Sequence, residues 1–202
     1  MTLKNDRWIK HQAALGMIAP FAPNQVRKVV SEDLEKNPIR NVLSFGCGSY
    51  GYDMRLSPKE FLIFRHVPGA VMNPKRFNPA NLEPVPLHHS EDGAFFILPA
   101  HSYGLGVAME HLLVPPNITV ICLGKSTYAR CGIILNATPA EASWRGHLTL
   151  EFSNSSGADC MIFANEGVCQ LLFFEGDPCD VTYEDRQGKY LDQPESVVTS
   201  IV

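Results

Sequence analysis

The sequence lacks any long apolar run, any Cys-x-x-Cys pair and any excess of positive charge. No hydrophobic stretch approaches the length that crosses a bilayer, and the N-terminal run MTLKNDRWIKHQ has no apolar signal core. The formal net charge of −4 argues against a nucleic-acid partner and leaves any phosphate binding to a local basic cluster. We therefore expect a cytoplasmic protein with neither a membrane nor a nucleic-acid partner.

Metal-binding and disulfide spacings are also missing. The six cysteines lie mostly within or beside apolar runs, which predicts reduced, buried thiols. The seven histidines form no cluster with metal-ligand spacing, and we interpret them as surface or core residues. The cysteines are Cys47, Cys122, Cys131, Cys160, Cys169 and Cys179.

Two familiar nucleotide signatures are incomplete. The run Gly124–Ser126 resembles the end of a P-loop, but the position of the loop's first glycine is occupied by Thr119. The run His89–Glu91 matches the His-x-Glu half of a zinc deaminase site, yet Pro178–Val181 is not the required Pro-Cys-x-x-Cys. These departures exclude both a P-loop NTPase and a zinc-dependent deaminase of that type.

Short apolar runs separated by scattered glycine and proline predict a mainly β fold, a distorted β-barrel or jelly roll. A short N-terminal helix is expected over Asp6–Leu15, capped by Asp6 and ended by Gly16. The length of 202 residues favours one domain spanning 1–202. Strands are expected at 53–56, 60–64, 94–98, 104–109, 118–123, 133–135, 147–153, 161–163 and 168–174.

The sequence predicts the structure of three further segments less sharply. Residues 25–35 fit either a second helix or an extended segment. The polar, proline-rich stretch 73–92 is typical of a surface excursion. The tail 180–202 is either a loose terminus or a lid that orders over a ligand.

The segment GKSTYARCG, residues 124–132, is the first candidate for chemistry. Ser126 is placed to cap a short helical turn that Gly132 ends, and the turn's free N–H groups with Lys125 would cradle a phosphate. Arg130 follows Ser126 by four residues and would share its face. The alternative is a capped surface turn without function.

The strand at 147–153 carries the second candidate, Glu151. A glutamate in mid-strand among apolar residues lies either on a water-exposed face or on a half-buried one. Half-burial would raise its pKa toward that of a useful general base. Gln170 also interrupts an apolar run and needs a hydrogen-bond partner. Alternation places Leu148, Leu150 and Phe152 on one face and His147, Thr149, Glu151 and Ser153 on the other.

Together these residues resemble the dCTP deaminases of the dUTPase-like trimeric superfamily. The matching segments are 44–56, 121–134, 144–154, 165–171 and 188–193, in the family's order. The resemblance implies a dUTPase-like barrel, a homotrimer with active sites between subunits, and hydrolysis of dCTP to dUTP and ammonia without zinc. It also implies Mg²⁺ bound with the triphosphate, feedback by dTTP, and a role in supplying dUTP for thymidylate synthesis.

The resemblance assigns roles residue by residue. Glu151 becomes the general base that activates water, and the neighbouring subunit donates Ser126 and Arg130 to the same site. Glu141 falls near the deoxyribose. The phosphate contacts fall on Lys125, Thr127 and Gln170, and the closing lid carries Tyr183, Lys189 and Gln193.

The chain departs from the family pattern just before and after Trp144. Ala142, Ser143 and Arg145 stand where acidic and proline residues are expected. The position just before Glu141 is not an arginine, as it is in some branches of the family, and the end of the tail, 196–202, lacks a basic residue. Three alternatives stay open: weakened activity or a pocket for a modified cytosine nucleotide, a deaminase–diphosphatase giving dUMP or a plain dUTPase, and a nucleotide-binding trimer without catalysis.

Overall fold

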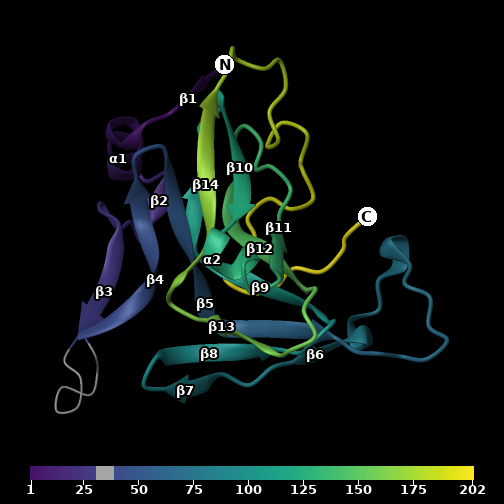
Figure 1. Cartoon of the computed structure of the whole chain (residues 1–202). Helices are drawn as coiled ribbons and strands as arrows, with labels where there is room; N and C mark the ends of the chain where they lie inside the picture. Colours follow the sequence, from purple (N-terminus) through teal and green to yellow (C-terminus); the bar gives the residue numbers. More distant parts are fainter. Residues whose placement is uncertain (31–38) are drawn as a thin grey trace.

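The computed structural model describes residues 1–30 and 39–202, and strands dominate it (Figure 1). The helical elements are α1 (Asp6–Ala14), α2 (Ser126–Ala129) and the 3-10 turns η1 (Pro74–Arg76) and η2 (Pro79–Asn81). The strands are β1 (Thr2–Leu3), β2 (Ile18–Ala19), β3 (Val26–Val30), β4 (Ile39–Gly48), β5 (Gly51–Phe64), β6 (Leu82–Pro84), β7 (His88–Ser90), β8 (Gly93–Leu98), β9 (Tyr103–Leu113), β10 (Ile118–Gly124), β11 (Ile133–Asn136), β12 (Arg145–Asn154), β13 (Cys160–Phe163) and β14 (Gly167–Glu175).

One large antiparallel sheet curls into a half-barrel. Its path runs β1-β14-β5-β9-β12-β11, and β10 pairs with β14 on the other side. The strands β10 and β11 lie next to each other across α2. Paired backbone hydrogen bonds of 2.9 Å between Val120 and Ala140 then join β10 to the loop that follows β11. The curl confirms the predicted distorted barrel.

A second sheet covers one end of the half-barrel. It has the order β13-β8-β7 and lies across the lower end of the long strands in Figure 1. The β3–β4 hairpin extends away on one side, and the segment with η1, η2 and β6 extends on the other. The stretch 73–92 is therefore an excursion as predicted, although it also contains β6 and β7.

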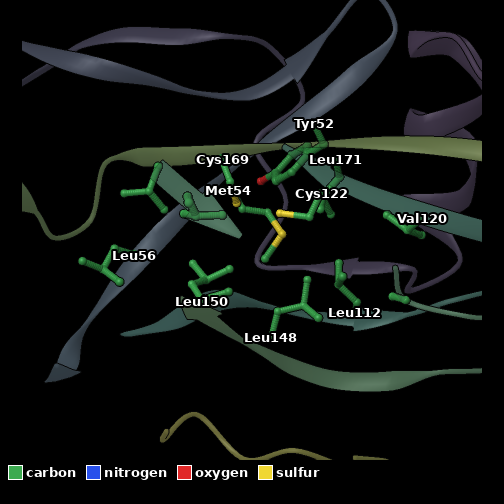
Figure 2. Close-up of a cluster of buried hydrophobic side chains, with 14 of the residues drawn as sticks. Tyr52, Met54, Leu56, Leu112, Val120, Cys122, Leu148, Leu150, Cys169 and Leu171 are labelled. Carbon is green, nitrogen blue, oxygen red and sulfur yellow. The ribbon is translucent and has the colours of Figure 1, made fainter. Parts of the chain in front are cut away.

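The hydrophobic core lies inside the curl. Side chains from β5, β9, β10, β12 and β14 converge there, with Met54 and Cys122 near the centre (Figure 2). Leu148 and Leu150 point from β12 into this core, as the alternating pattern predicts. The opposite face of β12 is therefore free to carry Thr149 and Glu151 toward the tail.

The local predictions needed correction in several places. The N-cap of α1 is Asn5, not Asp6, because the Asn5 side chain accepts the Trp8 N–H at 3.2 Å. The two strands expected at 53–56 and 60–64 form one strand, β5, with a register irregularity around Pro58 that accommodates the missing donor.

The remaining local predictions had mixed outcomes. In the segment 25–35, Val26–Val30 is extended, and the rest of that prediction lies outside the described residues. All six cysteines are free, but Cys131 and Cys179 are exposed and Cys160 is only half-buried, so full burial holds for the other three alone. Within the described ranges, no helix has the length and apolar character needed to span a membrane.

Candidate functional site

A cavity of about 700 Å³ opens on the face of the sheet opposite the core. Its floor includes Thr149 and Glu151 of β12, and one wall is the loop 137–144. The remaining walls come from β5, β9 and the C-terminal tail. Side chains from segments far apart in the sequence thus surround one carboxylate in mid-strand.

Glu151 is half-buried in this cavity. Burial raises the pKa of its carboxyl above the usual value, and a hydrogen bond from Asn136 partly opposes that rise. The Asn136 Nδ2 atom donates to Glu151 Oε2 at 2.8 Å. Burial also raises the pKa of Tyr103 on β9, and the charge of Glu151 raises it further. Glu151 therefore lies between an amide donor and a phenol, in an environment that favours proton uptake.

The tail is ordered over the cavity and attaches to β12. Gln193 forms a parallel bridge with Gly146, and its carbonyl accepts the His147 N–H at 2.9 Å. Thr149 Oγ1 donates to Gln193 Oε1 at 3.2 Å and accepts the Val198 N–H at 3.1 Å. Gly146 has φ +134°, and a β-carbon there would lie 2.6 Å from the Gln193 nitrogen. Only glycine permits this close approach.

Charged pairs and aromatic residues hold the tail from the side. Arg145 donates to both carboxylate oxygens of Asp192, at 2.5 and 3.0 Å, and to Glu184 at 2.6 Å. These carboxylates raise the pKa of the Arg145 guanidinium above its ordinary value. Trp144 Nε1 donates to the Tyr190 carbonyl at 2.8 Å. The tail is thus ordered against its own chain and is not a loose terminus, and its closing over a ligand as a lid stays a prediction.

Two predicted site residues line the cavity where the tail meets its wall. Tyr183 lines the cavity, and its hydroxyl accepts the Tyr190 N–H at 3.0 Å. Glu141 also lines the cavity and forms an ion pair with Arg186 of the tail. Lys189, by contrast, is exposed, with its ammonium 5.4 Å from the centre of the Tyr190 ring.

A second polar cluster, on β5 and β14, surrounds Asp53. This carboxylate is only 3% exposed. Lys125 Nζ donates to it at 2.6 Å, and Gln170 Nε2 donates at 3.0 Å. Lys125 also donates to Ser44 Oγ at 3.1 Å. Gln170 therefore has the partner that its place in an apolar strand requires, and Lys125 is held beside it.

The helix α2 begins next to this cluster. Its N-cap position is Lys125, and no side chain caps it, so the prediction of Ser126 as the cap is wrong. Ser126 is instead the first helical residue, and it is exposed on the surface. Arg130 donates to Ser126 Oγ at 3.4 Å, as their four-residue spacing predicts, and Gly132 follows with φ +80°. Thr127 is exposed beside them.

The predicted residues thus fall into separate groups within one subunit. Glu151, Glu141, Tyr183 and Gln193 line the cavity, and the other six lie outside its lining. Those six are Lys125, Ser126, Thr127, Arg130, Gln170 and Lys189. One subunit holds a carboxylate in a cavity, and it presents a hydroxyl and a guanidinium on a separate outer surface.

Sequence reasoning missed Asn136, Tyr103 and Asp53. Asn136 ends an apolar strand and faces Glu151 across the β11–β12 ladder, a pairing that the sequence alone does not reveal. Tyr103 begins β9, and its only signal is an aromatic residue beside a turn. Asp53 is a charged residue within a buried strand, which was a usable signal for a partnered carboxylate.

Among the described residues, no three or more His, Cys, Asp or Glu side chains lie together in a way that could hold a metal ion. The cavity offers a carboxylate with raised pKa, neighbouring hydroxyls and an aromatic wall. Such a site can take a proton from water and return it to a bound molecule.

A protein-family model described as dCTP deaminase-like matches residues 3–176. A protein named dCTP deaminase from Halorhodospira halophila (strain DSM 244 / SL1) is 49% identical over 195 residues, covering 96% of both chains. Another with that name, from Azotobacter vinelandii (strain DJ / ATCC BAA-1303), is 47% identical over 195 residues with the same coverage.

A solved structure is similar in fold. It is the crystal structure of 2'-deoxycytidine 5'-triphosphate deaminase from Agrobacterium tumefaciens, with a TM-score of 0.54 and 16% sequence identity. The match covers 86% of this chain and 48% of that one, so this chain spans about half of its length. At that identity the match supports the fold, and it agrees with the curled antiparallel sheet described above.

Proposed function

The chain belongs to the dCTP deaminase-like family, and from this premise we propose that it hydrolyses dCTP to dUTP and ammonia with Glu151 as the general base. The observation that carries the proposal is the half-buried Glu151 carboxylate in a cavity, with a pKa raised by burial. A base of that kind accepts a proton from water and can release it again within the same reaction.

The reaction needs one water and two proton deliveries. Glu151 takes a proton from water as the oxygen bonds to C4 of the cytosine ring. The electrons of the C4=N3 bond move to N3, which takes that proton from Glu151. The new hydroxyl then loses its proton through Glu151 to the amine, the C4–N4 bond breaks, and ammonia leaves a C4 carbonyl. One carboxylate serves every transfer, and no zinc-bound hydroxide is required.

The proposal places the active site between subunits of a homotrimer. Ser126 and Arg130 lie on an exposed surface, away from the Glu151 cavity of the same chain. The exposed apolar side chains Leu123 and Ile134, 50% and 60% exposed, are on the strands that flank α2. Burial of these side chains by a neighbour would bring Ser126 and Arg130 to that neighbour's cavity, where the guanidinium would stabilise the negative charge that develops during attack.

We assign the triphosphate to the polar cluster around Asp53. Lys125, Thr127 and Gln170 lie together near the start of α2, with Asp53 holding two of them in place. The substrate is the magnesium complex of dCTP, so the ion arrives bound to phosphate oxygens. Glu141 is assigned to the deoxyribose. Tyr183, Lys189 and Gln193 are assigned to the lid, and dTTP is the expected feedback inhibitor because it carries the same sugar and triphosphate.

The six free cysteines suit a reducing compartment, so the proposal includes a cytoplasmic location. It does not depend on that location.

The test is incubation of the pure protein with dCTP and Mg²⁺. We expect ammonia release in equal amount to dUTP, measured by an enzyme-coupled ammonia assay and by chromatography. Glu151→Gln keeps the shape and removes the base, so kcat should fall by about 10²- to 10⁴-fold while dCTP binding by calorimetry is largely retained.

Other products would redirect the proposal. The appearance of dUMP would indicate a combined deaminase and diphosphatase. Tight nucleotide binding with no turnover of any cytosine nucleotide, including 5-methyl-dCTP, would instead leave a binding protein and sink the proposal.

A further inference from the structure

The Glu151 carboxylate is anchored from its own chain by Asn136. The amide Nδ2 atom donates to Oε2 at 2.8 Å, and the described residues provide no second hydrogen bond to this carboxylate. A carboxylate is an acceptor, so the amide must present its nitrogen there. One carboxylate oxygen is thus held, and Oε1 is left for other partners.

The contact follows from strand register. Asn136 and Glu151 are direct partners across the antiparallel β11–β12 pair. Side chains at such positions start about 5 Å apart, within reach of one hydrogen bond. Asn136 is also the last residue of β11, which is the edge strand, and the cavity-lining loop begins at the next residue. The amide therefore joins the base to the start of the cavity wall.

We propose that Asn136 is a positioning residue for the deamination: it fixes the Glu151 carboxylate with Oε2 occupied and Oε1 aimed at the water. The inference rests on the proposed function, because it presumes that Glu151 is the base. Asn136 acts through Glu151, so the term catalytic residue does not apply to it.

The hydrogen bond has two consequences. It restricts the carboxylate to one rotamer, which places the proton acceptor for attack at C4. It also favours the charged form and so opposes the effect of burial on the pKa of Glu151. Without the amide, the base would be both mobile and more easily protonated. The titratable groups that share its cavity are Tyr103, Glu141, Tyr183 and Tyr190, and in the proposed trimer Arg130 of the neighbour joins them.

The experiment measures kcat and KM for dCTP across pH in Asn136→Leu, which keeps the size and removes the donor. We expect kcat at neutral pH to fall on the order of 10- to 100-fold with a smaller change in KM. The acid limb of the pH profile should move to higher pH, so that activity partly recovers in alkali. Asn136→Asp should move the limb further, since a second negative charge lies beside the base. Asn136→Gln restores an amide donor and should recover part of the loss.

The chain offers a matched control. Asn117 donates its Nδ2 to Glu175 Oε1 at 2.9 Å, away from the cavity, so Asn117→Leu removes the same kind of bond. We expect its pH profile to match that of the wild type. Light scattering checks that every variant keeps the wild-type assembly. Asn136 is exposed, which makes its replacement compatible with folding.

The outcomes distinguish a failure of the proposed function from a failure of the role proposed for Asn136. A wild type that deaminates no cytosine nucleotide contradicts the proposed function. A wild type that is active, with an Asn136→Leu variant whose pH profile is unchanged or whose loss is the same at every pH, overturns the role of Asn136. A readout without turnover is a ¹³C NMR titration of glutamate carboxyls, assigned with Glu151→Gln: the Glu151 pKa should rise in Asn136→Leu, and an unchanged value would also overturn the inference.

Discussion

At the scale of single residues, the charged form of Glu151 is unfavourable for the stability of the fold that holds it. The core-facing residues of β12 are buried with apolar neighbours, whereas Glu151 loses water on the other face and gains one hydrogen bond from Asn136. Burial raises the pKa of this carboxyl in the folded chain above its unfolded value. The environment that makes it a base therefore also makes its charged form unfavourable.

The first stability prediction follows from that direction. A raised folded-state pKa means that stability is fully present below the unfolded pKa, about 4.3 for Glu, and is lost as pH rises through the folded pKa. Glu151→Gln removes the ionisation, and its amide oxygen still accepts from Asn136. We expect the variant to have a higher Tm than the wild type at pH 7, with the difference shrinking toward pH 4. Thermal unfolding across pH measures this.

Glu175→Gln is the control of opposite sign. Hydrogen bonds and charge from Lys4, with a hydrogen bond from Asn117, lower the pKa of Glu175. Its contribution is therefore present above the unfolded pKa and lost as pH falls through the folded one. That variant should lose stability at neutral pH. A Glu151→Gln variant without any gain at neutral pH would contradict the account of Glu151.

At the scale of elements, strand β12 positions both the proposed base, Glu151, and the C-terminal tail. Alternation along the strand places Glu151 in the cavity, and Gly146 near its start lets the tail backbone approach. Arg145, at the first position, then fastens the lid through Asp192 and Glu184. This departure from the family pattern thus acts on the tail, and Arg145 is not among the residues that line the cavity.

Arg145→Glu tests the fastening. A carboxylate there would face Asp192 and Glu184 and repel both, so the tail should detach more often. We expect faster chymotryptic cleavage at Tyr183 and Tyr190 and a higher KM for dCTP, measured by timed digestion and steady-state kinetics.

Arg65→Glu is the matched change for that experiment, because Arg65 pairs with Glu83 at 2.9 Å on a different part of the surface. It should leave tail cleavage at the wild-type rate. Equal cleavage in wild type and Arg145→Glu would show that the other contacts of the tail, such as those of Gln193 and Trp144, are sufficient to hold it.

At the scale of the whole molecule, a single chain carries the two proposed halves of the site on different surfaces. The cavity contains Glu151, and the outer surface of α2 contains Ser126 and Arg130. In the proposed cyclic trimer, repeated heterologous contacts would join the two halves three times. This arrangement explains why neither half is complete in the isolated chain.

Subunit mixing tests that arrangement. Glu151→Gln and Arg130→Ala should each be nearly inactive alone. After unfolding and refolding together in equal amounts, about three quarters of the trimers are mixed and each has one intact site, so activity should return to about one quarter of the wild type. Refolding each variant alone is the control, and a mixture as inactive as its parts would place Glu151 and Arg130 in one subunit's site.

The sequence by itself determined the mainly β fold, the residues on each face of β12, and the pairing of Ser126 with Arg130. These depend on local periodicity and spacing, and hydrophobic burial enforces them wherever one face of a strand is covered. Short turns and single caps were less predictable. Asn5 replaced Asp6 because neighbouring polar residues compete for the same free N–H groups, whereas Lys125 precedes α2 without any side-chain cap.

Only the tertiary structure decided which distant residues meet. The partnership of Asn136 with Glu151 depends on strand register, that of Lys125 and Gln170 with Asp53 on strand order, and the seating of the tail on the backbone of Gly146. Register and order result from the sum of many weak contacts across the whole sheet, so no local pattern encodes them. For the same reason, the sequence does not determine the raised pKa of Glu151, because that pKa depends on the burial of the side chain in the folded sheet.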